Sequence, residues 1–132
     1  INFGACTTLK CGISIWQLSK EHLIANNLGS TYSQKGNNNL ELCFETDDFN
    51  NTYEKLLKLD LNFMHKAVVE SWGQKTVRFY DPEDNLIEIG ESVPCFIKRL
   101  LFEGLSKEEI SVKTAFPLEL IECYSLESLS QT

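Results

Sequence analysis

Residues 77–91 read Val77-Arg78-Phe79-Tyr80-Asp81-Pro82-Glu83-Asp84-Asn85-Leu86-Ile87-Glu88-Ile89-Gly90-Glu91. Apolar and polar side chains alternate on both sides of the acidic segment 81–85. This alternation predicts two strands of a hairpin, because successive side chains of a strand point to opposite faces. Pro82 fixes φ and has no N–H to donate, and Asp84 or Asn85 can take the left-handed conformation that a short turn needs.

The polar face of this hairpin carries a carboxylate that needs a partner. Glu88 shares that face with Arg78 and Tyr80 if the two strands pair in direct register. A charge in the middle of a strand must be paired, hydrated or bound to metal. Two interpretations follow: Glu88 forms an ion pair with Arg78 across the hairpin, or it is a metal ligand or catalytic base.

The segment before the hairpin predicts a strand, a helix and a strand. Residues 40–45 alternate, with Leu40, Leu42 and Phe44 on one face and Glu41, Cys43 and Glu45 on the other. Apolar residues at helical spacing predict a helix over 48–59, which we expect to lie on the leucine and phenylalanine face. Residues 62–70 predict a third strand, so the order from Leu40 to Glu91 is β-α-β-β-β.

The two ends of the chain differ from this central unit. Residues 2–9 and 13–18 predict two short strands, and residues 19–39 predict a linker with a short helix near 21–25. Pro94 predicts the start of a helix that runs to about Phe102.

Two further helices are predicted in the C-terminal tail. Ser106 and Glu109 form the pattern of a capping box, and Pro117 opens a helix through about Tyr124. Glu119 and Glu122 on that last helix would repel phosphate, which argues against DNA recognition by the tail.

Composition narrows the class of protein. The 132 residues carry a formal net charge of −7, which argues against general binding to nucleic acid or anionic membranes. We find no apolar run of the roughly 20 residues that span a bilayer, and no signal peptide. The five cysteines are scattered without a C-x-x-C pair. They predict neither a disulfide framework nor a structural zinc site, and they suit a reducing cytoplasm.

The motif Arg-Phe-Tyr-Asp-Pro-x-x-Asn-x-Ile-Glu at the end of a β-α-β-β-β unit resembles the vicinal oxygen chelate superfamily. That superfamily includes glyoxalase I, bleomycin-resistance proteins and extradiol dioxygenases. The resemblance is strongest over 39–91 and includes Phe44-Glu45-Thr46-Asp47-Asp48 and Trp72-Gly73-Gln74. It implies an α+β fold in which paired βαβββ modules form a curved mixed sheet or open barrel. Residues 1–91 would then be the glyoxalase-like domain, in which 1–18 resemble the end of a preceding module, and 92–132 a helical extension.

The resemblance also implies where a metal would bind. Glu88 matches the glutamate of the last strand, Glu41 falls at the first-strand position where histidine is common, and Gln17 falls where the preceding module would supply a ligand. These oxygen donors suit manganese or magnesium, whereas nickel and zinc favour imidazole or thiolate. A divalent cation of one of these four kinds is therefore expected, with Glu88 and Glu41 also as candidate catalytic groups.

Four other residues are candidates for ligand binding. Arg78, Tyr80 and His65 would line the polar face, where His65 shares strand parity with Phe63 and Ala67. Trp72 lies in a turn and could wall the mouth of a cavity, because aromatic side chains supply much of the surface of small-molecule sites.

Three functions remain open on the sequence. The first is a metal-dependent lyase or isomerase of glyoxalase type that acts on a small oxygenated substrate. The second is a non-catalytic protein that binds an antibiotic or metabolite without metal, and the third is a sensor whose helical tail contacts a protein partner. Exposed strand edges favour a homodimer in each case.

Overall fold

The computed structural model describes residues 2–10, 12–17, 19–29 and 40–126, and it contains two compact units, residues 1–39 and 40–132. The elements of the first unit are β1 (Asn2–Phe3), β2 (Cys6–Thr8), β3 (Ser14–Trp16) and α1 (Leu23–Leu28). Its strands form an antiparallel sheet in sequence order. The strand predicted over 2–9 is two short strands, β1 and β2, because the chain turns back at Gly4. Residues 30–39 of the predicted linker lie outside the described residues.

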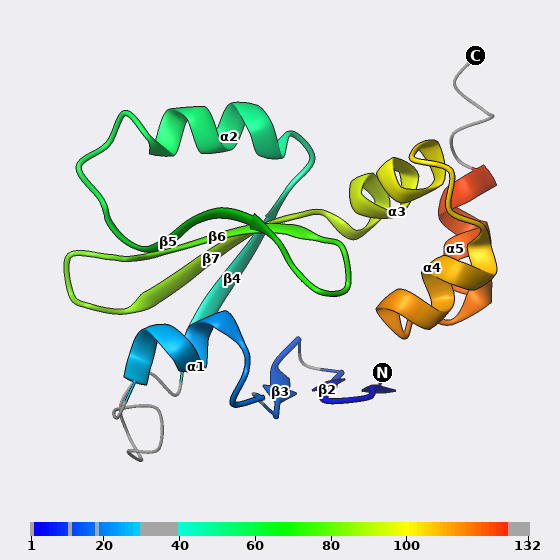
Figure 1. Ribbon diagram of the computed structural model, residues 1–132, viewed down its shortest axis with the longest axis horizontal. Helices are drawn as coiled ribbons and strands as arrows, with labels where there is room; N and C mark the ends of the chain where they lie inside the picture. The colour runs from blue at the N-terminus through cyan, green and yellow to red at the C-terminus, as the bar shows by residue number, and fades with distance from the viewer. Residues whose placement is uncertain (1, 11, 18, 30–39, 127–132) are drawn as a thin grey trace. The chain divides into compact units, whose positions relative to one another are not determined.

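The second unit has the predicted β-α-β-β-β order. Its elements are β4 (Glu41–Thr46), α2 (Phe49–Leu56), β5 (Asn62–Val69), β6 (Lys75–Tyr80) and β7 (Leu86–Glu91). The sheet order is β4-β7-β6-β5, with β4 parallel to β7 and the other pairs antiparallel. The helix α2 lies along one face of this sheet (Figure 1). The α+β mixed sheet expected from the sequence is confirmed.

The 77–91 hairpin forms in the predicted register. Arg78 lies directly opposite Glu88 on β7. Asp84 takes the left-handed conformation at φ 62°, and the Asp81 carboxylate accepts hydrogen bonds from the backbone of Glu83 and Asn85, each at 2.9 Å. The turn therefore closes through its own acidic side chain, which is why an aspartate precedes Pro82.

Strand β5 breaks the simple alternation that its sequence predicts. Phe63 pairs with Phe79, His65 pairs with Arg78, and the register shifts between the two pairs. Phe63 therefore belongs to the apolar face with Phe79, and their rings meet edge to face at 6.1 Å. The expectation that Phe63 and His65 share a face is wrong, because a bulge inserts a residue between them.

The leucine and phenylalanine face of β4 is less covered than predicted. Leu40 is 67% exposed, Leu42 42% and Phe44 55%. By contrast, Val77 on β6 and Ile87 on β7 are buried. Strand β4 is at the edge of the sheet, so its apolar side chains stay exposed while Val77 and Ile87 on the same face are buried.

The tail folds into three helices that follow β7 directly (Figure 1). They are α3 (Val93–Phe102), α4 (Lys107–Thr114) and α5 (Leu118–Leu126). Their buried core consists of Phe96, Ile97, Leu100, Ile110 and Ile121. The predicted capping box is present, with Ser106 and Glu109 each bonding the other's backbone N–H. Across the described residues, no helix is both long and apolar enough to cross a membrane.

Candidate functional site

A buried arginine is the centre of the polar face of the second unit. Arg78 is 1% exposed, and its guanidinium bonds three carboxylates, two from strands β4 and β7 and one from the turn after β5. Nε donates to Glu41 at 2.5 Å, Nη1 donates to Glu70 at 2.6 Å, and Nη2 forms an ion pair with Glu88. The Arg78–Glu88 pair, one of the two interpretations of the hairpin, is thus part of a larger cluster.

Strand geometry brings these groups together. Cys43 on β4 is the register partner of Glu88 on β7, and Glu88 is the partner of Arg78 on β6. Paired residues project from the same face of a sheet, so one row of the sheet presents these three side chains side by side. Glu70 follows the end of β5 and turns inward, where its carboxylate also accepts from Thr76 at 2.8 Å.

His65 completes the cluster as a neutral imidazole. Its Nδ1 lies 2.8 Å from the carbonyl oxygen of Lys66, to which only a protonated nitrogen can donate. Nε2 is then unprotonated and accepts from Arg78 Nη1 at 3.2 Å. Burial lowers the pKa of His65, which agrees with a neutral ring.

The charges of the cluster do not cancel. Glu41, Glu70 and Glu88 share one guanidinium, so three negative charges less one positive charge leave a surplus of two when all are ionised. Burial raises the pKa of Glu88 to about 7, and Glu41 and Glu70 add to this rise although Arg78 opposes it. Burial alone would lower the pKa of Arg78, but Glu88 and Glu41 raise it. The face therefore attracts positive charge, whether a proton or a cation.

Three side chains of this face could hold a metal ion. Glu41, Cys43 and Glu88 each offer one ligand atom, and these atoms lie within 4.8 Å of one another. Two of the three were expected from the sequence. Cys43 was missed as a ligand, although its shared parity with Glu41 was visible in the alternation of residues 40–45.

The other predicted site residues are distributed more widely. Tyr80 is at the end of β6, two residues beyond Arg78 on the same face. Trp72 packs against the buried core of the tail, and its Nε1 donates to Gln74 at 3.0 Å. Gln17 follows β3 in the first unit, and its role as a third ligand stays a prediction. Glu70 was not predicted, because the irregular register of β5 hides which face the end of that strand presents.

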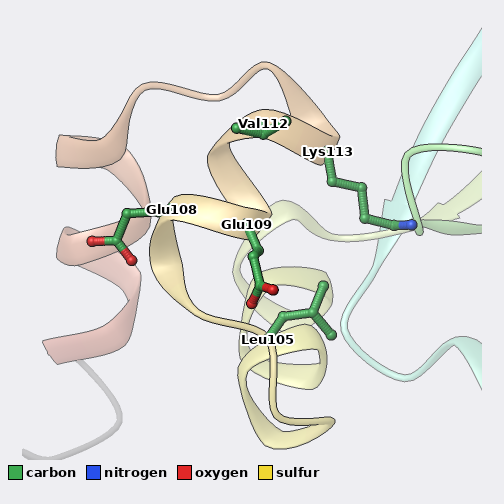
Figure 2. Close-up of a pocket in the computed structure, with 5 residues that line it drawn as sticks. All are labelled: Leu105, Glu108, Glu109, Val112 and Lys113. Atoms are coloured by element: carbon green, nitrogen blue, oxygen red, sulfur yellow. The ribbon is translucent and has the colours of Figure 1, made fainter.

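An open hollow on the tail is separate from this cluster. It has a volume of about 450 Å³ and is lined by Leu105, Glu108, Glu109, Val112 and Lys113. Figure 2 shows that α4 and the segment before it supply all five side chains, and that Lys113 extends away from the helix. None of the predicted site residues lines this hollow.

Comparison with known proteins places the chain in a family. A solved structure of a member of the Glyoxalase/bleomycin resistance protein/dioxygenase superfamily from Sphaerobacter thermophilus DSM 20745 is 25% identical, with a TM-score of 0.36. The match covers 39% of this chain and 41% of that chain, so less than half of that relative is spanned. A protein of unknown function from Agrobacterium tumefaciens str. C58 is 26% identical over 70% of this chain and 72% of that chain, with a TM-score of 0.40. No curated protein matches the chain.

The family model described as a glyoxalase-like domain matches residues 1–94, most of the 132 residues. The predicted membership of the vicinal oxygen chelate superfamily is confirmed, and the chain belongs to the glyoxalase-like domain family.

Proposed function

We propose that the chain is a cation-dependent lyase or isomerase of glyoxalase type, with its site on the polar face around Arg78. The observation that carries the proposal is the gathering of three carboxylates around one buried guanidinium. Burying carboxylates without matching positive charge costs free energy of folding, so the surplus negative charge of the cluster favours a divalent cation as its partner.

The donor set fits such an ion. Glu41 and Glu88 supply carboxylate oxygens and Cys43 supplies a thiol, all close enough to share one ion. A thiolate ligand moves the preference from magnesium toward zinc or nickel, in contrast to the oxygen-only set expected from the sequence. When bound, the cation would polarise a substrate oxygen and stabilise the negative charge that forms on it.

Glu88 is suited to carry a proton. Without a bound cation, burial raises the pKa of Glu88 to about 7, so its carboxylate takes up and releases a proton near neutral pH. Arg78 holds Glu88 in place from β6, and neutral His65 keeps the guanidinium oriented from β5. Tyr80 on the same face could donate a hydrogen bond to a substrate oxygen.

A second candidate is a protein that binds a small molecule without metal. The observation that favours it is the position of Arg78 between Glu41 and Glu88, where the guanidinium itself neutralises part of the charge that a cation would. In that case Tyr80 and His65 would contact an antibiotic or metabolite, and no reaction would follow.

A thermal-shift screen distinguishes the two functions. The probes are thiol adducts of small oxo-aldehydes and a set of antibiotics, each with and without Zn²⁺, Ni²⁺ or Mn²⁺. Because a ligand stabilises by RT ln(1 + [L]/Kd), binding raises the melting temperature. The lyase predicts stabilisation by an adduct only when the cation is present, together with its turnover. Stabilisation that is the same without cation would favour the binder.

We also propose that this unit pairs with a second module, in a homodimer or from elsewhere in the protein. At the edge of the sheet, Leu42 and Phe44 of β4 and Leu40 just before it are exposed, and unpaired strand edges with apolar side chains favour association.

A reducing cytoplasm is the proposed compartment. Cys6, Cys43, Cys95 and Cys123 form no disulfide among the residues that the structure describes.

A further inference from the structure

The turn between β5 and β6, residues 70–74, contacts both the tail helices and the polar face. Two backbone hydrogen bonds close it: Glu70 N–H donates to Gln74 O at 2.8 Å, and Gly73 N–H donates to Glu70 O at 2.8 Å. Gly73 has φ 100°, a conformation that side chains other than glycine's disfavour. The turn thus has a fixed shape, in which its middle faces the tail helices and its two ends face the polar face.

Residues of the tail helices bond and contact the middle of this turn. Arg99 of α3 donates from Nη2 to Gly73 O at 2.6 Å and from Nε to Glu91 at 2.8 Å. A methyl group on Gly73 would lie 3.0 Å from Lys113 Cε of α4 and 3.3 Å from Leu100 of α3. Residues of two tail helices therefore approach the turn as closely as a glycine allows.

The ends of the same turn reach into the Arg78 cluster. Glu70 at its start accepts from Arg78 at 2.6 Å. Gln74 at its end donates from Nε2 to Glu91 O at 2.7 Å and lies over Gly90. A methyl group on Gly90 would be 3.1 Å from Gln74 Nε2 and 3.7 Å from Glu88 Oε1, so the amide and the Glu88 carboxylate flank one glycine.

Trp72 links the two sides of the turn. Its ring packs on the tail core, and its Nε1 orients Gln74 by donating to the side-chain oxygen. The chain of contacts from Arg99 through Gly73 and Trp72 to Gln74 and Glu70 is continuous.

We propose that the tail helices α3–α5 position the cation and ligand site by holding the 70–74 turn, with Arg99 as the positioning residue. This inference rests on the proposed function, because the cation that the site would hold comes from that proposal. Arg99 does not touch the site. It fixes the turn whose ends place Glu70 against Arg78 and Gln74 beside Glu88.

This positioning role requires the several N–H donors of the Arg99 guanidinium. One guanidinium spans the Gly73 carbonyl and both oxygens of Glu91 at once. A lysine keeps the charge that Glu91 needs but offers a single ammonium, which cannot hold both groups in a fixed geometry. Arg99→Lys therefore loosens the turn while leaving no buried carboxylate without a counter-charge.

The test uses the full chain with Arg99→Lys and, as matched control, Glu103→Gln. Glu103 accepts from Arg99 Nη1 at 2.8 Å on the exposed side of α3, so the control removes an ion pair of Arg99 without touching the turn. Two readouts are measured: solvent exchange of the Arg78 Nη1–H signals, which donate to Glu70 of the turn, in a ¹H–¹⁵N spectrum, and Zn²⁺ affinity at fixed pH. Trp72→Phe, which keeps ring packing but removes the donor to Gln74, is the second variant.

We expect Arg99→Lys to speed exchange of the Arg78 Nη1–H and to weaken Zn²⁺ binding by about tenfold, the usual scale for groups behind metal ligands. Trp72→Phe should change both in the same direction, and Glu103→Gln neither. The proposal is overturned if the Arg78 signal of Arg99→Lys and Trp72→Phe matches wild type, even where their melting temperatures fall. If wild type binds no Zn²⁺, the cation site fails, but the Arg78 signal still decides the role of the tail.

Discussion

At the scale of single residues, Glu88 should control how stability depends on pH. Its pKa in the folded protein is raised to about 7 from an ordinary value of 4.5, so the folded state binds more protons than the unfolded state between these values. Stability therefore falls as pH rises from about 4.5 to 7. The difference amounts to about 3 kcal/mol at most, since one pKa unit is about 1.36 kcal/mol.

Glu88→Gln should remove this dependence, because an amide resembles the protonated acid and does not titrate. Urea unfolding at several pH values between 5 and 8 measures it, with Glu83→Gln in the exposed turn as control. A wild-type stability that rises across this range would show that Glu88 is stabilised, not strained, as an anion.

Of the residues in the cluster, Arg78 should be the one whose substitution lowers the free energy of unfolding most. Arg78→Met leaves Glu41, Glu70 and Glu88 without their shared counter-charge, and uncompensated buried charge typically costs about 3–5 kcal/mol. A divalent cation that binds among the same carboxylates should restore part of that lost stability. Chemical unfolding with and without Zn²⁺ gives both quantities. A loss below 1 kcal/mol would mean that the cluster is effectively solvated.

At the scale of elements, Gly73 and Gly104 provide a matched pair for the contact between tail and turn. Both have positive φ, 100° and 96°, but only Gly73 has neighbours within 4 Å of an added methyl group. Gly104→Ala should cost about 1 kcal/mol from backbone conformation alone. Gly73→Ala should cost more, about 1–3 kcal/mol, because Leu100 and Lys113 must also shift. Equal losses in thermal unfolding would show that the tail does not press on the turn.

The sequence predicted the elements whose side-chain alternation is regular. The 77–91 hairpin and the capping box of α4 follow from local pattern. The same pattern offered Asp84 or Asn85 for the left-handed position and an ion pair with Arg78 as one of two roles of Glu88, and the structure has Asp84 and the ion pair. The bulges of β5 could not be read from alternation, because one inserted residue changes the face of every side chain beyond it. That is why Glu70 was missed and Phe63 was placed on the wrong face.

The surroundings of side chains were harder to predict than the elements. Cys43 was placed on the correct face, but only the parallel pairing of β4 with β7 shows that it lies beside Glu88. Trp72 was expected at the mouth of a cavity, whereas the structure packs it on helices that follow much later in the chain. Contacts of this kind depend on tertiary packing, which a strand or turn pattern does not encode.

At the scale of the whole molecule, the exposed edge of β4 should determine association. Phe44→Lys places a charge on an exposed apolar position of that strand and should convert a dimer to a monomer. Leu59→Lys is the control, since Leu59 is as exposed, at 56% against 55% for Phe44, but lies outside the sheet. Light scattering after size exclusion gives the mass. A mass that responds equally to both substitutions, or to neither, would contradict an interface at β4.

A direct measurement of ion binding tests most sharply whether the carboxylates around Arg78 form a site for a divalent cation. Isothermal titration calorimetry measures Zn²⁺ binding to wild type, Glu88→Gln, Cys43→Ser and Glu83→Gln. We expect one bound ion per site in wild type and Glu83→Gln, weaker binding in Cys43→Ser, and loss of binding in Glu88→Gln. No binding to wild type tighter than about millimolar, roughly −4 kcal/mol, or the same affinity in all four proteins, would contradict it.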